Sequence, residues 1–243
     1  MIRTHKFRNK LPEAERSEVA RLAAATLHTD LGVDALKYMA DIRHIDDQIL
    51  RDFHVGYVPQ HIKNIHGDQH EFAGRIVLPV FDQHDQLVAL SSRDWRENAF
   101  MKFFHEQYIK SNYLYGLNVA KKNIIHHDKA IIVEGELDVM TSHSVGLNMT
   151  VGLMGSALSL KQIGLLSRYC QTIFFVADGD VAGVNAAKKA AQIETVRGVT
   201  EGTDIQFHTV YLPENHDPDS FINTHGKDSY MNRLKHAKEN EIL

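Results

Sequence analysis

The spacing of apolar and polar residues divides the chain into a helical opening, a short two-stranded segment and a half in which strands and helices alternate. Residues 12–28 and 34–51 carry apolar side chains at helical spacing, which predicts one helix followed by two shorter ones. The spacing then changes to period two. Residues 75–82 and 87–94, joined by a polar turn, therefore predict a β-hairpin.

Short apolar runs alternate with amphipathic segments in the second half of the chain. The runs that predict strands are AIIV, MTVG, TIFFVA and FHTVYL, at residues 130–133, 149–152, 172–177 and 207–212. Strands this apolar are covered on both faces, which indicates a parallel sheet with helices as right-handed crossovers. Ser159 is expected to cap one of these helices. The fold class is therefore α/β: a parallel sheet with flanking helices, plus a smaller N-terminal α+β subdomain.

The changes of pattern also suggest where the domains begin and end. We expect a helical arm at residues 1–30, an α+β subdomain at 31–126, and an α/β domain with a C-terminal helix at 127–243. The sequence has no internal repeat and no linker rich in Ser, Gly or Pro. Boundaries therefore rest on the switch from helical to alternating patterns.

Composition places the chain among folded globular proteins. Of its 243 residues, 43% are hydrophobic and 24% are charged, which is enough to bury a core. The single cysteine, Cys170, can form neither an internal disulfide nor a Cys-rich zinc cluster, so we expect no zinc and a reducing, cytoplasmic setting. The chain contains no apolar run long enough for a signal peptide or a membrane span, so no membrane partner is expected.

Charge is distributed unevenly along the chain. The net charge is -4, which lacks the overall basic surplus of many nucleic-acid binders. Residues 127–243 have 10 Lys and Arg against 15 Asp and Glu, a net charge of -5, whereas residues 1–126 have a net charge of +1 and contain a basic tract from 93 to 122. We expect this tract to face an anion.

Carboxylates follow three of the predicted strands at the point where each ends. Ligands of open parallel sheets bind beyond these carboxyl ends. Oxygen ligands favour Mg²⁺ or Mn²⁺, and a cation relieves the repulsion between clustered acids. The alternative is ordinary polar turns, which would explain one such loop better than it explains three. The acids are Glu134, Asp138, Asp178, Asp180, Asp217 and Asp219.

Two other sites with similar motifs fail at single positions, and a third motif is missing. A calcium-binding EF-hand that starts at Asp178 would need Glu where the chain has Lys189. A haloacid-dehalogenase-type phosphatase usually has Thr or Val where this chain has Ala182. The chain has no P-loop sequence, so phosphate chemistry would depend on metal ions.

Two motifs give the sequence a specific resemblance. VEGELD at residues 133–138 and DGDVAG at 178–183 resemble the Toprim domain shared by primases, topoisomerases and some nucleases. RIVLPVFD at 75–82, the tract at 110–117 and Asp-Pro-Asp at 217–219 follow the order found in the RNA-polymerase core of bacterial and phage DnaG-type primases. The likeness covers roughly residues 34–238.

The resemblance implies a DNA-directed RNA polymerase that makes short RNA primers on single-stranded DNA from ribonucleoside triphosphates. The reaction is nucleotidyl transfer with two Mg²⁺ or Mn²⁺ ions. Glu134, Asp178 and Asp180 would be catalytic and hold the metals, with Glu134 also able to accept the proton of the attacking hydroxyl. The resemblance assigns Asp138, Asp217 and Asp219 to the rest of the metal shell. It assigns nucleotide and template phosphates to Arg43, Arg75, Arg93, Lys102 and Lys110.

The same resemblance implies partners. Primases of this type commonly carry a zinc ribbon and a helicase-binding or helicase domain, which this sequence lacks. We therefore expect a replicative helicase and a separate zinc-binding chain as partners. The setting would be a bacterial cytoplasm, or that of the host for a phage protein.

Two other functions stay open from the sequence. A Toprim metal-dependent nuclease would use the same acids on nucleic acid that already exists. A non-catalytic module that binds single-stranded DNA in a replisome is the other. Clustered carboxylates argue against a pure binder, because they repel phosphate.

Overall fold

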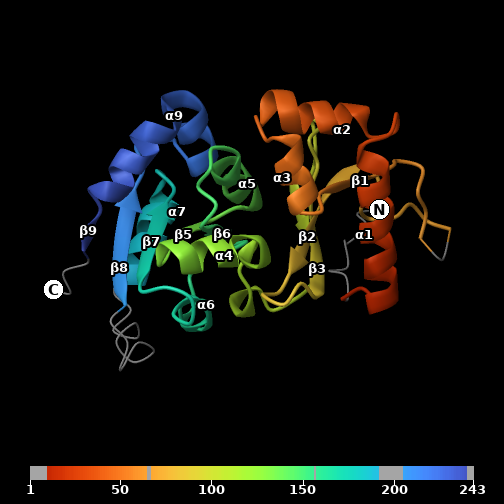
Figure 1. Cartoon of the computed structure of the whole chain (residues 1–243). Coiled ribbons are helices and arrows are strands. Elements are labelled where there is room, and N and C mark those ends of the chain that lie inside the picture. Colours follow the sequence, from red (N-terminus) through yellow and green to blue (C-terminus); the bar gives the residue numbers. More distant parts are fainter. Residues whose placement is uncertain (1–9, 65–66, 156, 192–204, 240–243) are drawn as a thin grey trace.

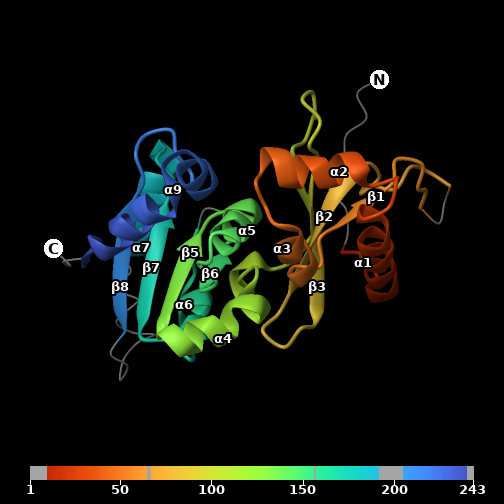
Figure 2. The same cartoon turned by 45° about the horizontal axis from the view of Figure 1, so that its top comes forward.

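The computed structural model, which describes residues 10–64, 67–155, 157–191 and 205–239, contains two β-sheets that lie side by side with helices packed around them (Figure 1). Figure 2 shows the first sheet with the N-terminal helices on one side of the molecule and the second sheet on the other. Residues 1–9 of the predicted arm lie outside the described residues. No helix in the described ranges is both long and apolar enough to span a membrane.

The first sheet is antiparallel, with strand order β1-β2-β3-β4. Its strands are β1 (Gly56–Val58), β2 (Arg75–Phe81), β3 (Leu87–Arg93) and β4 (Phe103–His105). The predicted hairpin is confirmed as β2 and β3, which pair from Ile76↔Arg93 onward. The sequence did not predict β1 and β4, because three residues are too few to show an alternation.

The N-terminal helices are those that the sequence predicts, with one irregularity. They are α1 (Glu13–Leu27), α2 (Val33–Lys37), a π-helical turn η1 (Tyr38–Ile42) and α3 (Asp47–Asp52). Helix α1 packs on the first sheet through a buried ion pair in which Arg16 Nη2 lies 2.7 Å from Glu106 Oε1. Glu106 also accepts a hydrogen bond from the Leu90 backbone N–H of β3. The structure thus docks this helix on the core, a placement that its composition did not reveal.

The second sheet has strand order β6-β5-β7-β8-β9. Its strands are β5 (Lys129–Val133), β6 (Thr150–Gly152), β7 (Thr172–Ala177), β8 (Gln206–Tyr211) and β9 (Lys238–Glu239). The first four are parallel, as predicted, and the mixed α/β class is confirmed. The two-residue β9 adds an antiparallel edge that the sequence did not predict.

Helices cover both faces of the second sheet. They are α4 (Leu117–His127), α5 (Glu136–Ser144), α6 (Leu160–Leu166), α7 (Val181–Ala191) and α9 (Pro218–Lys235), and a short 3-10 turn, η2, spans Lys110–Asn112. One face packs on α4 and α6, and the other on α5 and α9. Ser159 caps α6 as predicted, since its hydroxyl accepts a hydrogen bond from the Gln162 N–H.

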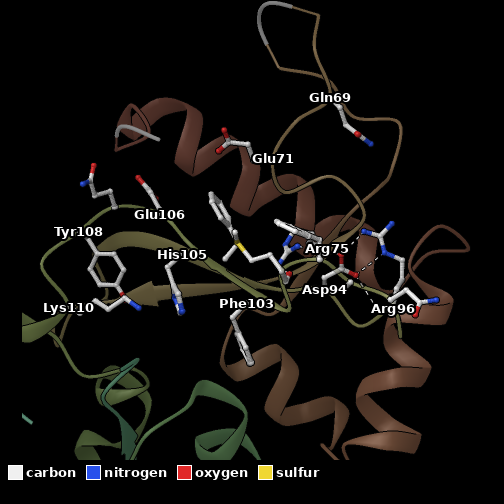
Figure 3. A pocket seen from close by; sticks show the side chains of 16 residues that line it. Gln69, Glu71, Arg75, Asp94, Arg96, Phe103, His105, Glu106, Tyr108 and Lys110 are labelled. Carbon is white, nitrogen blue, oxygen red and sulfur yellow. Dashed lines mark hydrogen bonds and ion pairs between the residues drawn. The ribbon is translucent and has the colours of Figure 1, made fainter. Parts of the chain in front are cut away.

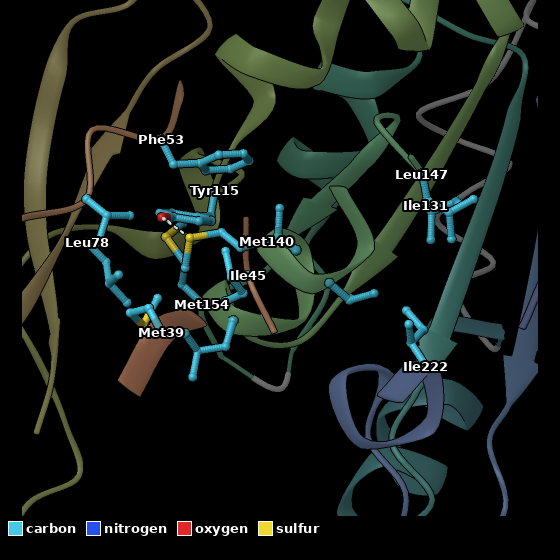
Figure 4. Close-up of a cluster of buried hydrophobic side chains, with 14 of the residues drawn as sticks. Met39, Ile45, Phe53, Leu78, Tyr115, Ile131, Met140, Leu147, Met154 and Ile222 are labelled. Carbon is cyan, nitrogen blue, oxygen red and sulfur yellow. Dashed lines mark hydrogen bonds between the residues drawn. The ribbon is translucent and has the colours of Figure 1, made fainter. Parts of the chain in front are cut away.

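The two halves share one hydrophobic core. Phe53 from the end of α3 stacks on Tyr115 with ring centroids 5.6 Å apart, and Tyr115 lies against Met140 of α5 (Figure 4). Leu78 of β2 belongs to the same buried cluster. The predicted boundary at 126/127 falls inside the last turn of helix α4, which packs on β5 and β6. The domain boundaries at 30/31 and 126/127 stay predictions.

Candidate active site

Glu134 and Asp178 lie at the same edge of the second sheet. Strand β5 ends at Val133 and β7 at Ala177, and the two strands pair in parallel. Each acid is the residue that follows its strand, so both side chains start from neighbouring carboxyl ends. The sheet therefore brings together two carboxylates that are 44 residues apart in the sequence.

The pKa values at this edge show like charges at close range. Burial raises the pKa of Asp178 to about 7, with further increases from Glu134, Asp217 and Asp180. Burial also raises the pKa of Glu134, and Asp180 adds to that effect. The pKa of Asp138 lies well above its ordinary range because of burial, followed by the charges of Asp217 and Asp178. Carboxylates from three strand ends therefore act on one another.

The loops that carry these acids need glycine because the backbones run very close together. A Cβ atom at Gly179 would lie 1.8 Å from the carbonyl oxygen of Pro213. The N–H of Gly179 donates a hydrogen bond to His216 O at 2.7 Å, which joins the loop after β7 to the loop after β8. Only a residue without a side chain fits between Asp178 and Asp180.

Asp138 and Asp180 also hold the loops in place. Asp138 accepts hydrogen bonds from the N–H of Gly135 at 3.0 Å and from the N–H of Asp219 at 3.1 Å. It thereby links the turn after β5 to the first turn of α9. Asp180 accepts from the Gly183 N–H at 2.6 Å, which caps the start of α7.

Asp217 and Asp219 begin α9, and their oxygens have protein partners. Asp217 caps the helix through the Ser220 N–H at 2.7 Å. Asp219 is buried and accepts from Thr141 Oγ1 at 2.7 Å and from Asn223 Nδ2 at 2.9 Å. Its other oxygen accepts from Arg43 Nη1 at 2.6 Å. In this arrangement Asp219 connects helices, and its assignment to the metal shell stays a prediction.

The acids at this edge fit a divalent cation in one specific respect. Glu134 Oε1 and Asp178 Oδ1 are buried and make no hydrogen bond. Such oxygens are costly unless a cation or a donor satisfies them. Within the described ranges, no three His, Cys, Asp or Glu side chains form a complete metal-ligand group. Mg²⁺ commonly binds through one or two carboxylates together with water and substrate phosphates, so a complete protein cage is unnecessary.

The basic residues predicted from the sequence lie in different surroundings. Arg43 donates to Tyr38 Oη and Asp219, while Arg75 is buried and donates to Ser92 Oγ at 2.8 Å. Arg93 lies over the Phe103 ring, 4.7 Å from its centroid. Lys102 is exposed, and Lys110 donates from Nζ to the carbonyl oxygen of Met154 at 2.7 Å. Arg43 therefore contacts α9, Arg75 and Arg93 lie on inner strands of the first sheet, and Lys110 contacts the loop after β6.

A cleft of about 1180 Å³ lies along β4 and the neighbouring loops, with Arg75 and Lys110 in its wall. Figure 3 shows Tyr108, His105 and Lys110 together at one end, and Arg75, Asp94 and Arg96 at the other. The remaining lining residues include Phe100, Met101, Phe103 and Phe104. Arg43, Arg93 and Lys102 are not among the residues that line this cleft.

Sequence reasoning missed two residues near this cleft, His105 and Glu136. His105 Nδ1 lies 3.5 Å from Glu136 Oε1, and the Glu136 side chain is buried. A signal was present, since Glu136 lies between Glu134 and Asp138 in the VEGELD motif. Successive helical residues point about 100° apart, which directs Glu136 away from Asp138 and toward the first sheet.

Residues 131–222 match the family model described as Toprim-like. This range includes the ends of β5, β7 and β8, where the acids lie. Over 226 residues the chain is 28% identical to the DNA primase of Aquifex aeolicus strain VF5. The alignment covers 81% of this chain and 44% of that primase. The chain thus spans less than half the length of the curated relatives it matches.

Solved structures of DnaG primases share this fold. A DnaG catalytic core matches 94% of this chain and 80% of its own with a TM-score of 0.85 at 22% identity. The match to a DnaG catalytic domain bound to single-stranded DNA covers 94% of this chain and 81% of that domain, with a TM-score of 0.83 at 21% identity. The match to the zinc-binding and RNA polymerase domains of the Aquifex aeolicus primase covers 95% of this chain and 63% of that one, with a TM-score of 0.77 at 25% identity.

Proposed function

We propose that this protein is the catalytic core of a DNA primase. The chain has the fold of the DnaG primase catalytic core, and its residues 131–222 match a Toprim-like family. It would synthesise short RNA primers on single-stranded DNA from ribonucleoside triphosphates. One observation supports the proposal: Glu134 and Asp178, which follow neighbouring parallel strands, each have a buried carboxylate oxygen without a hydrogen-bond partner.

The proposed reaction is nucleotidyl transfer, in which a primer 3′ hydroxyl attacks the α-phosphate of an incoming nucleotide and pyrophosphate leaves. Glu134, Asp178 and Asp180 would hold two Mg²⁺ or Mn²⁺ ions. When bound, these ions would neutralise the phosphate charge and orient the reacting groups. The unpaired Oε1 of Glu134, whose pKa is raised, is suited to accept the proton of the hydroxyl.

The other site residues would support this chemistry from two directions. Asp138, Asp217 and Asp219 would complete the metal shell or hold the loops that form it, as their hydrogen bonds to the starts of α5 and α9 indicate. The basic residues proposed for nucleotide and template phosphates remain Arg43, Arg75, Arg93, Lys102 and Lys110. Arg75 and Lys110 lie in the wall of the cleft, where a strand or nucleotide would find aromatic side chains beside the positive charge.

The proposed partners are single-stranded DNA, nucleoside triphosphates and the RNA primer. Support comes from the DnaG domain solved with single-stranded DNA, which shares this fold. A separate zinc-binding chain and a replicative helicase complete the proposal. The Aquifex aeolicus structure is described as having a zinc-binding domain beside the polymerase domain.

A priming assay tests the proposal. Purified protein is incubated with labelled ribonucleotides, an unprimed single-stranded template and Mg²⁺ or Mn²⁺, with and without candidate helicase and zinc-binding chains. We expect short oligoribonucleotides that disappear in Asp178→Ala. Template shortened without new synthesis would identify a nuclease, and binding of the template alone would identify a non-catalytic module.

A second assay tests the assigned basic residues. Arg93→Ala and Lys102→Ala should weaken binding of labelled single-stranded DNA or nucleotide while thermal unfolding stays normal. DNA binding weakens as salt rises, and the logarithm of the binding constant falls linearly with the logarithm of the salt concentration. Each lost phosphate contact should make this slope shallower by about one. Unchanged affinity in a folded variant would remove that residue from the assignment.

A further inference from the structure

Glu136 is a buried carboxylate that the mechanism above does not use. It lies in the first turn of α5, its side chain is 3% exposed, and its Oε1 makes no hydrogen bond. Nδ1 of His105, on β4 of the other sheet, lies 3.5 Å from this oxygen and is also buried without a hydrogen-bond partner. Glu136 therefore acts across the junction between the two halves of the molecule.

The groups around Glu136 are the ones that close one end of the cleft. His105, Tyr108 and Lys110 all line it and stand together in Figure 3. Lys110 Nζ and Tyr108 Oη both donate to Met154, to its carbonyl oxygen and its sulfur. Burial lowers the pKa of Lys110 and of His105, and the charge of Glu136 acts in the opposite direction on both.

A purely structural role does not account for a charge at this position. The attraction to His105 at 3.5 Å offsets little of the hydration that a buried carboxylate loses, and an apolar residue would pack there at lower cost. The arrangement becomes favourable when a second anion binds on the other side of His105. With Glu136 facing Nδ1, the Nε2 of His105 remains for a ligand. An imidazole between two anions is protonated and donates from both nitrogens.

We propose that Glu136 is a positioning residue that holds His105 and Lys110 as the phosphate-binding donors at this end of the cleft. The inference rests on the proposed function and extends it by two residues, Glu136 and His105. The ligand chemistry is a phosphate group. It would come from a nucleoside triphosphate or from the backbone of single-stranded DNA.

The test uses Glu136→Gln in the full chain, with Glu13→Gln on the exposed face of α1 as the matched control. Calorimetry measures binding of ATP with Mg²⁺, and fluorescence anisotropy measures binding of a labelled DNA strand. We expect about tenfold weaker binding of one of the two ligands, which identifies the source of the phosphate. The same loss is expected for Lys110→Met, and the double variant should be no weaker than Lys110→Met alone.

Three results would overturn the inference. The first is unchanged affinity for both ligands in Glu136→Gln. The second is a loss of Mn²⁺ binding in Glu136→Gln as large as in Asp178→Asn, which would make Glu136 a metal ligand. The third is a double variant whose loss of ligand affinity equals the sum of the losses in Glu136→Gln and Lys110→Met. If Glu136→Gln does not fold, His105→Asn replaces it, with the exposed His84→Asn as control.

The design separates this inference from the proposed function. Wild-type protein that binds neither ATP nor DNA and makes no primer would overturn both. Wild-type protein that makes primers, together with a folded Glu136→Gln that binds both ligands normally, would overturn the role of Glu136 alone.

Discussion

Arg43 donates a hydrogen bond from Nη1 to Asp219 Oδ2 at 2.6 Å, which joins two residues 176 positions apart. Arg43 follows the π-helical turn at Tyr38–Ile42, and Asp219 lies in the first turn of α9. The contact therefore connects the N-terminal helices to the helix whose start faces the carboxylate edge. Since it also fixes Asp219, which accepts from Thr141 of α5, three segments meet at one carboxylate.

We expect Arg43→Met to lower the free energy of unfolding by about 1–3 kcal/mol, because it leaves one oxygen of the buried Asp219 unpaired. Asp219→Asn should cost a similar amount, and the double variant less than the sum, as a urea-unfolding cycle would show. The exposed pair of Arg21 and Glu18 supplies the control, for which Arg21→Met should leave the urea-unfolding midpoint unchanged. Strict additivity for Arg43 and Asp219 would mean that the pair contributes no coupling.

Gly179→Ala should destabilise the protein by more than about 2 kcal/mol, because its Cβ would overlap the Pro213 carbonyl oxygen. Moving the backbone would also separate Asp178 from Asp180, so primer synthesis should fall further than the fraction of folded protein. Gly155→Ala is the control, since its Cβ would meet no atom within 4 Å. Thermal unfolding and the priming assay measure both effects. Wild-type stability in Gly179→Ala would show that the loop adjusts freely.

Asp178→Asn should make the metal-free protein more stable at pH 8 while abolishing synthesis. Burial and neighbouring acids raise the pKa of Asp178 to about 7, so its charged form opposes folding at pH 8. Allowing for partial exposure, we expect a gain of about 1–3 kcal/mol. Mg²⁺ should then raise the melting temperature of the wild type and have little effect on the variant.

The exposed Asp30→Asn provides the matched control for this experiment, with unchanged stability and an unchanged response to Mg²⁺. A folded Asp178→Asn protein that is less stable than the wild type at pH 8 would contradict the repulsion between these acids.

His143 should make the protein less stable as the pH falls. Its Nε2 lies 2.9 Å from the carbonyl oxygen of Thr150, and burial lowers its pKa to about 4. An unfolded histidine takes up a proton near pH 6.5, whereas the folded one does so only near pH 4. Stability contributed by neutral His143 is therefore present above pH 6.5 and lost progressively between pH 6.5 and 4.

The loss reaches on the order of 3 kcal/mol for a pKa lowered from 6.5 to about 4. It is measured as the difference between wild type and His143→Gln in urea unfolding at pH 7.5 and pH 5, because Asp178 and Asp138 change stability in the opposite direction in both proteins. His84→Gln, in an exposed turn, should follow the wild type. Parallel pH profiles for wild type and His143→Gln would show that His143 takes up its proton at the same pH in the folded and the unfolded protein, against a lowered pKa.

The elements of the second half follow from the sequence because local patterns determine them. The apolar runs of β5 and β7 are buried along most of their length, and a parallel sheet covered on both faces is the arrangement that does so, whereas β8 is partly exposed. That arrangement places the residue after each strand at a common edge. Glu134 and Asp178 were therefore recognisable from their positions relative to the strands.

The tertiary structure decided which charged side chains pair. The resemblance assigned Arg43 to phosphate, yet the structure pairs it with Asp219 on α9. Helix α1 likewise acquires its place only through the buried pair of Arg16 and Glu106. Such pairs depend on which segments the whole chain brings together, and the local pattern around each residue contains no trace of that.

The sequence by itself determined the parallel sheet and the acids at its edge, because strand burial and strand ends are local properties. Only the tertiary structure decided how the two sheets face each other across Tyr115, and hence that His105 of the first half meets Glu136 of the second. The cleft and its charged end depend on that packing. Long-range packing is the sum of many weak contacts between distant segments, and the local spacing of apolar residues does not reveal which segments make them.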